Sequence, residues 1–268
     1  MTPRYSNISF LSDYGLSDEF VGVVHAVIAE LAPHARVLDI NHNIPAFDVR
    51  AGSLSLARAV QYLPSGVVLA VVDPGVGTSR RAVAVEVGGG EGVFVGPDNG
   101  LLSAAVALAG GADRAVELTN NEHHLQSHGA TFAGRDVFAP VAALLANGVP
   151  LTDFGPLIDP GLLMPGLVPL PQESDGALQC EVTWVDVYGN CQLNVGIDDV
   201  VAWGSPIKVT IGEVVRSCAV VRNFESIGTG GLALVVDSYG MLALATDRGS
   251  AAVEINFGVG DSVHLARA

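Results

Sequence analysis

The sequence has few cationic side chains. Its 13 lysines and arginines face 28 aspartates and glutamates, so the formal net charge is −15 at pH 7. Such a charge repels the phosphate backbone of nucleic acids and anionic membrane surfaces. We therefore expect no nucleic acid and no membrane as a partner, whereas a cationic ligand would not be repelled.

Cysteine and long apolar runs are also scarce. The three cysteines, Cys180, Cys191 and Cys218, are odd in number and have no CxxC spacing. This argues against a disulfide framework or a structural zinc site and fits a reducing compartment, so we expect a cytoplasmic protein. No apolar run reaches the roughly 20 residues that a membrane-spanning helix needs.

Apolar residues are abundant, at 49% of the chain, and up to residue 155 they form short β-branched runs that alternate with segments of helical period. Residues 20–31 carry one apolar stripe, which predicts a helix capped by Ser17 or Asp18. Further helices are expected over 51–62, 101–108 and 137–147, and a hairpin turn over 88–91. Strand–helix alternation is typical of a mainly parallel sheet covered by helices, so residues 1–155 are predicted to form an α/β domain.

The pattern changes after residue 155. Residues 156–177 are rich in proline and glycine without any period, which indicates a linker. From 178 to 268, short apolar runs, including 252–255, are separated by glycine-containing turns, and the only candidate helix covers 197–202. This part is predicted to be a small antiparallel β-barrel domain.

Polar side chains gather where the predicted strands of the first domain end, which is where α/β sheets bind their ligands. Asp13 follows the first strand; it can accept hydrogen bonds from a ribose diol, or serve as a turn or capping residue. Asp73 and Arg80 flank a tight Pro–Gly loop after a buried strand. An aspartate beside an arginine suits holding a water molecule or a charge, but it can equally be a plain salt bridge within a loop.

Two further groups of residues are weaker candidates for a binding site or a metal site. An amide and an aromatic face can together recognise the edge of an adenine and stack on it, which makes Asn190 and Phe224 candidates, although each alone is more often a turn or core residue. His123, His124 and His128 lie close together in sequence. Adjacent histidines in a polar loop are usually solvated, so no metal site is predicted.

Seven segments, in this order, resemble the S-adenosylmethionine (SAM) hydroxide adenosyltransferases, relatives of fluorinase and chlorinase. They are FLSDYG, NHNIPAFDVRAG, VVDPGVGTSRR, GPDNGLL, TFAGRDVFAP, DVYGN and DSYGMLALA. The resemblance covers nearly the whole chain and implies the same two-domain fold. It also implies SAM as substrate, cleaved at ribose C5′ by water to adenosine and L-methionine without cofactor or metal. Family members are homotrimers whose ligands lie between the N-terminal domain of one subunit and the C-terminal domain of a neighbour.

The resemblance also implies roles for individual residues. Asp13 would hold the ribose hydroxyls, and Phe47 would line the ligand nearby. The groups implied to face the methionine amino and carboxylate groups are Asp18, Asp186 and Ser238. The residues implied to recognise adenine are Asn190 and Phe224, and Tyr188 belongs to the same binding segment.

Asp73 and Arg80 match two members of the Asp–Arg–His set that the hydrolase branch carries and the halogenases lack, which favours water over halide. The third position, a histidine in TFHGRD, is Ala133 here. Three explanations stay open: an introduced substitution, a natural variant in which His128 or water takes over, or a loss of catalysis. The alternatives to a hydrolase of reduced activity are therefore a SAM-dependent halogenase and a non-catalytic SAM-binding protein.

Overall fold

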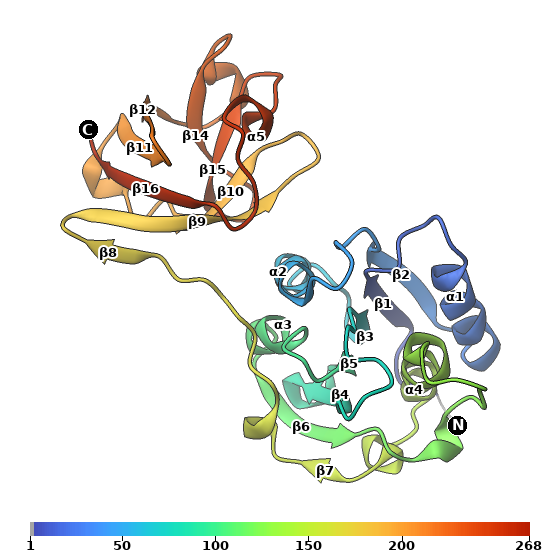
Figure 1. Ribbon diagram of the computed structural model, residues 1–268. Coiled ribbons are helices and arrows are strands. Elements are labelled where there is room, and N and C mark those ends of the chain that lie inside the picture. The colour runs from blue at the N-terminus through green and yellow to red at the C-terminus, as the bar shows by residue number, and fades with distance from the viewer. Residues whose placement is uncertain (1–2) are drawn as a thin grey trace. The chain divides into compact units, whose positions relative to one another are not determined.

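The computed structural model describes residues 3–268 of the chain, which forms two compact units, one up to Val168 and one over Pro169–Ala268 (Figure 1). The boundary falls inside residues 156–177, the stretch predicted to be a linker. No helix within the described part is long and apolar enough to cross a bilayer.

The N-terminal unit is a seven-stranded sheet with helices on both faces (Figure 1). In spatial order its strands are β2 (Arg36–Asn41), β1 (Asn7–Ser12), β3 (Gly66–Val71), β5 (Gly92–Pro97), β4 (Ala82–Val87), β6 (Ala112–Glu117) and β7 (Leu157–Ile158). Its helices are α1 (Phe20–Leu31), α2 (Val49–Val60), α3 (Ser103–Leu108) and α4 (Ala139–Ala146), the last preceded by a π-helical turn over Gly134–Phe138.

The central strand β3 is buried along its whole length because both faces of the sheet are covered. Its alternate side chains enter two separate cores. Val67, Leu69 and Val71 pack with α1 and α4, whereas Val68 and Ala70 pack with α2 and α3. The continuous apolar run of β3 therefore results from two-sided burial.

The prediction of a mainly parallel sheet is correct for only half of the strand pairs. β2, β1, β3 and β5 pair in parallel, but β4 is antiparallel to β5 and to β6, and β6 is antiparallel to β7. The hairpin turn predicted over 88–91 joins β4 to β5, as expected, and it leaves no room for the crossover of about a dozen residues that parallel strands require. The expected helix over 20–31 is present, but the predicted cap is wrong, because Glu19 precedes the helix and no side chain caps it.

The C-terminal unit is an antiparallel sheet that curls into a nearly closed barrel (Figure 1). In spatial order its strands are β12 (Val214–Cys218), β11 (Ile207–Ile211), β16 (Ser262–Arg267), β9 (Ala177–Val185), β10 (Cys191–Gly196), β15 (Met241–Thr246), β14 (Leu232–Val236) and β13 (Val220–Val221), with β8 (Gln172–Ser174) on β9. Only the short β13–β14 pair is parallel.

Two details of this unit differ from the sequence prediction. Residues 252–255, predicted to be a strand, lie in the short helix α5 (Ala251–Glu254), where the Ser250 hydroxyl accepts a hydrogen bond from the Val253 N–H at 3.2 Å. These four residues, with Glu254 among three apolar ones, are too few to show a decisive period, so the cap determines the outcome. The helix expected over 197–202 is reduced to one 3₁₀ turn, Val201–Trp203.

Replacing Leu69 by alanine is expected to destabilise the N-terminal unit by about 2–5 kcal/mol, because this fully buried side chain would leave a cavity between the sheet and its helices. Urea unfolding followed by far-UV circular dichroism measures the loss. Both tryptophans, Trp184 and Trp203, lie in the C-terminal unit, so their fluorescence follows that unit separately. The control is Leu108→Ala, where the side chain is 66% exposed. An equal effect of the two variants would contradict the core assignment.

Candidate functional site

Two aspartate-bearing loops lie side by side at the C-terminal edge of the N-terminal sheet. Asp13 follows β1, and Asp73 comes two residues after β3, the parallel neighbour of β1. The Asp13 N–H donates to the Val71 carbonyl oxygen at 3.3 Å, which ties the first loop to the end of β3. Parallel pairing therefore places both carboxylates at the edge where such sheets bind ligands.

The structure brings Asp13 and Phe47 together. The Phe47 N–H donates to Asp13 Oδ2 at 2.9 Å. Phe47 has a φ of 68°, a left-handed conformation that residues other than glycine rarely adopt, and its side chain is 72% exposed. An exposed aromatic ring in a strained backbone is a feature of binding sites. Asp18 is also exposed, in the segment that leads to α1.

Asp73 and Arg80 form a buried ion pair. Arg80 Nε donates to Asp73 Oδ1 at 3.0 Å, and Nη2 makes a short contact with Oδ2, so the pair is bidentate. The side chains are only 5% and 13% exposed, and the guanidinium lies over the Phe138 ring, 5.4 Å from its centre. Two parallel hydrogen bonds fix both groups in one geometry. Such a pair can hold a small polar molecule in a defined place, but it is not arranged as a strong base.

Tyr14, to which no sequence pattern assigned a role, links this pair to the TFAGRD segment. Burial raises the pKa of the Tyr14 hydroxyl, and the charges of Asp13 and Asp73 raise it further, against a smaller opposing effect of the Gly134 N–H. The hydroxyl therefore stays protonated at neutral pH. A β-carbon at Gly134 would clash with this hydroxyl, so the close approach requires glycine.

Ala133 and Arg80 line the same cavity, whose volume is about 470 Å³. His124 and Asp136 also line it. His128 is exposed and is not among the lining residues. The position where the resemblance implies a histidine thus lines the same cavity as the arginine of the ion pair, and the nearby histidine that also lines it is His124.

In the C-terminal unit, two turns of the same construction carry several of the predicted residues. In DVYGN, Asp186 Oδ1 accepts the N–H groups of Tyr188 and Asn190, both at 2.9 Å. In DSYGM, Asp237 Oδ1 accepts the N–H groups of Tyr239 and Met241, at 2.8 and 2.9 Å. The glycine of each turn has a positive φ, 84° at position 189 and 81° at position 240. Each motif is therefore a turn organised by its own aspartate.

Both turns contribute to one pocket of about 390 Å³, which contains four of the predicted residues: Asp186, Asn190, Phe224 and Ser238. Tyr188, 75% exposed, lines an adjoining hollow together with Asn190 and Phe224. Trp184 and Gln192 also line the pocket and had no signal in the sequence, whereas Asp237 belongs to a recognised motif but was given no role of its own. Gln192 Nε2 donates to Asp237 Oδ2 at 2.5 Å, which connects β10 to the second turn.

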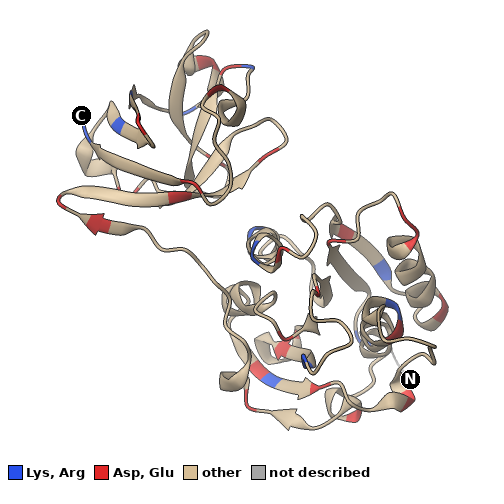
Figure 2. Ribbon diagram, in the orientation of Figure 1, with Lys and Arg blue, Asp and Glu red and all other residues tan. Residues whose placement is uncertain are grey.

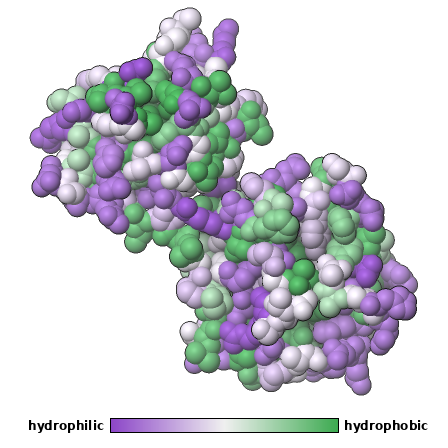
Figure 3. All heavy atoms as spheres, in the orientation of Figure 1, coloured by the Kyte–Doolittle hydropathy of each residue, from purple (hydrophilic) through white to green (hydrophobic). Residues whose placement is uncertain are grey.

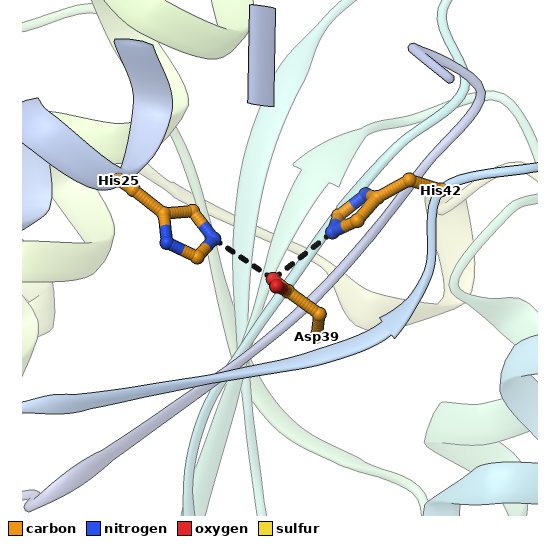
Figure 4. Close-up of side chains that lie close together, drawn as sticks. All are labelled: His25, Asp39 and His42. Atoms are coloured by element: carbon orange, nitrogen blue, oxygen red, sulfur yellow. Dashed lines mark hydrogen bonds and ion pairs between the residues drawn. The ribbon is translucent and has the colours of Figure 1, made fainter. Parts of the chain in front are cut away.

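A further cluster, formed by two histidines and an aspartate, contacts the loop that carries Asp13. His25 Nε2 and His42 Nε2 lie 2.8 and 3.0 Å from the same oxygen of Asp39 (Figure 4). Burial raises the pKa of Asp39, but the bonds and charges of the two histidines outweigh it, and the net pKa is lowered. His42 also contacts Ser12 Oγ at 2.7 Å, and its carbonyl oxygen accepts the Gly15 N–H at 2.7 Å.

The ligand atoms of this cluster lie within 4.8 Å of one another, so by type and spacing these three residues could hold a metal ion. Both histidines already contact the Asp39 carboxylate, and the contacts of His42 to Ser12 and Gly15 show its structural effect: the cluster anchors the loop that carries Asp13.

The distribution of charge and hydropathy over the surface does not mark a further site. Acidic residues are spread over both units (Figure 2), and polar and apolar residues are interspersed over the face shown in Figure 3. The charge of the whole chain therefore does not mark a site, and the candidate site rests on the pockets and loops described above.

Comparison with known proteins covers almost the entire chain. Residues 8–155 match the SAM hydroxide adenosyltransferase N-terminal domain, and residues 180–264 match the C-terminal domain of the same family. A protein of Salinispora arenicola named (R)-S-adenosyl-L-methionine hydrolase is 46% identical, over 96% of this chain and 97% of that protein. A fluorinase of Actinoplanes sp. is 25% identical, over 97% of each chain.

A solved structure agrees with the sequence comparisons. An uncharacterized conserved protein from Thermotoga maritima superposes with a TM-score of 0.88 at 35% identity, over 97% of this chain and 100% of that one. These matches confirm the resemblance found in the seven sequence segments. The chain belongs to the SAM hydroxide adenosyltransferase family.

Proposed function

We propose that this protein hydrolyses (R)-S-adenosyl-L-methionine, with water attacking ribose C5′ to give adenosine and L-methionine. Relatives that are 46%, 45% and 38% identical over nearly the whole chain bear the name of that hydrolase. In the structure, the proposal depends above all on the buried Asp73–Arg80 pair, which lies at the same sheet edge as Asp13.

In this mechanism, the main task of the protein is to align a water molecule with the C5′–S bond. The sulfonium of SAM is already an activated leaving group, so the C5′–S bond breaks without a general acid and methionine leaves as a neutral thioether. Charge disperses as the bond breaks, and a water-poor site favours that transition state. The protein must hold one water molecule in line with sulfur, about 3 Å from C5′. Asp73 and Arg80, fixed by their bidentate contact, are suited to this task.

Substrate binding divides between the two units in this proposal. Asp13 accepts the ribose hydroxyls, and the exposed ring of Phe47 covers them. In the C-terminal pocket, Asn190 and Phe224 bind the adenine. The methionine amino and carboxylate groups are bound by Asp18, Asp186 and Ser238. Because these residues belong to two units, we propose that the complete site forms in a homotrimer, between one subunit and its neighbour.

Halogenation is the less favoured chemistry. A halide would have to shed its hydration shell beside the Asp73 carboxylate, which repels an anion, whereas water can donate a hydrogen bond to it. The relatives named fluorinase are also more distant, at 25% to 28% identity, than those named hydrolase.

Asp73→Asn should lower kcat for adenosine formation by about 10²–10⁴ with little change in KM, because the variant keeps the shape of the side chain but weakens the hold on the water. Chromatography of adenosine after incubation with SAM measures the rate. The control is Asp153→Asn, at an exposed position outside the site. Equal rates for Asp73→Asn and the parent protein would contradict the role of the pair. Binding of SAM by the parent without adenosine would indicate a non-catalytic binding protein.

Sedimentation equilibrium at micromolar concentration should give a mass of about 83 kDa, three times the 27.6 kDa of one chain. The reason is that the proposed ligand residues of the two units complete a site only across subunits. A purely monomeric protein that still turns SAM over would refute the composite site.

Treatment with EDTA should leave both SAM binding and the rate of adenosine formation unchanged, since neither the leaving group nor the water needs a Lewis acid in this mechanism. Isothermal titration calorimetry and the product assay, before and after dialysis, test this. Activity that is lost with EDTA and returns on addition of a divalent ion would overturn the metal-free mechanism.

A further inference from the structure

His124 has a buried ring nitrogen with no protein partner. Its Nε2 is buried and makes no hydrogen bond to any group in the described part of the chain. A buried polar atom of this kind normally has a partner, and in an enzyme the missing partner can be substrate or water. The same side chain lines the cavity of about 470 Å³ that Arg80 and Ala133 also line.

The loop around His124 is held in place from several sides. Asn120 caps the 3₁₀ turn Asn121–His123 by accepting the Glu122 N–H, and its amide donates to the Asp153 carbonyl oxygen at 2.8 Å. On the other side, the Leu125 N–H donates to the Asp136 carbonyl oxygen at 2.8 Å, which pins the loop to the π-helical turn directly after Ala133.

The neighbouring histidine has a different environment. The His123 ring packs against Phe154, with ring centres 4.9 Å apart. His123 therefore has a packing role, whereas His124 is the member of the pair that lines the cavity. Ala133, which carries only a methyl group, lines the same cavity as His124 and Arg80.

The protonation state of His124 suits a proton acceptor. Burial lowers its pKa, and the neighbouring His123 lowers it further. At neutral pH the ring is therefore neutral and one of its nitrogens carries a lone pair. The charged groups beside it in the cavity are Arg80 and Asp136, each engaged with an ion-pair partner of its own.

We propose that His124 supplies the imidazole that position 133 lacks: it orients the attacking water with Arg80 and accepts its proton. This rests on the hydrolase function proposed above. The water oxygen forms the bond to C5′, the C5′–S electron pair leaves with sulfur as the neutral thioether of methionine, and the proton of the water passes to His124 and then to solvent. Ala133 in this chain is then compensated, and the protein has full activity.

The test measures kcat and KM for adenosine formation in the full-length protein. His124→Ala should lower kcat by about 10²–10⁴ and leave KM nearly unchanged, because the substrate contacts are elsewhere. Added imidazole should restore the rate of His124→Ala as its concentration rises. Ala133→His should raise the rate little in the parent protein but restore it in His124→Ala. The matched control is His128→Ala, an exposed histidine of the same loop, which should behave like the parent.

Each outcome decides between the alternatives. If the parent forms adenosine and His124→Ala is equally fast, the hydrolase function stands and the role of His124 is wrong. If the parent is inert and only Ala133→His is active, His124 does not replace the missing histidine. A slow His124→Ala that neither imidazole nor Ala133→His restores, while still binding SAM, would show a structural role and also overturn the proposal.

Discussion

The buried pairing of Asp73 with Arg80 is the interaction on which the N-terminal site depends. Two hydrogen bonds fix the carboxylate and the guanidinium in one plane, and Phe138 and the surrounding chain exclude solvent from them. Removing one partner of such a pair leaves an unpaired buried charge, which typically costs about 3–5 kcal/mol. The pair thus has both a structural and a chemical consequence: it spans the loop between β3 and β4, and it holds Arg80 in the lining of a cavity of about 470 Å³.

Two close contacts that involve the backbone position the residues around this pair. Gly134 allows the Tyr14 hydroxyl to reach the backbone of the TFAGRD segment, and the strained Phe47 backbone brings its N–H to Asp13. Neither contact stabilises the fold as a core residue would. Both position groups at the edge where β1 and β3 end, and the His25–Asp39–His42 cluster supports the same loop from the other side.

In the C-terminal unit, two turns of the same construction position the residues of one pocket. Asp186 and Asp237 each organise a D-x-Y-G-x turn through the same two N–H groups, and the two turns line one pocket. The motifs were recognised separately in the sequence, each as a short polar segment after a strand. That they face one pocket depends on the order of β9, β10, β15 and β14 in the barrel.

The sequence by itself determined the α/β and β parts of the chain, the main helices, the β4–β5 hairpin, the family and the residues that carry its motifs, because these depend on local periodicity and on segments that can be read in order. Only the tertiary structure decided the antiparallel half of the first sheet, the partners of Tyr14 and the contrast between His124 and His128. These features depend on long-range contacts: which strands become neighbours, and which side of a loop packs against a distant segment. Two histidines four residues apart look equivalent in the sequence, and they differ only because the loop is pinned to the turn after Ala133, so that His124 lines the cavity and His128 is left in solvent.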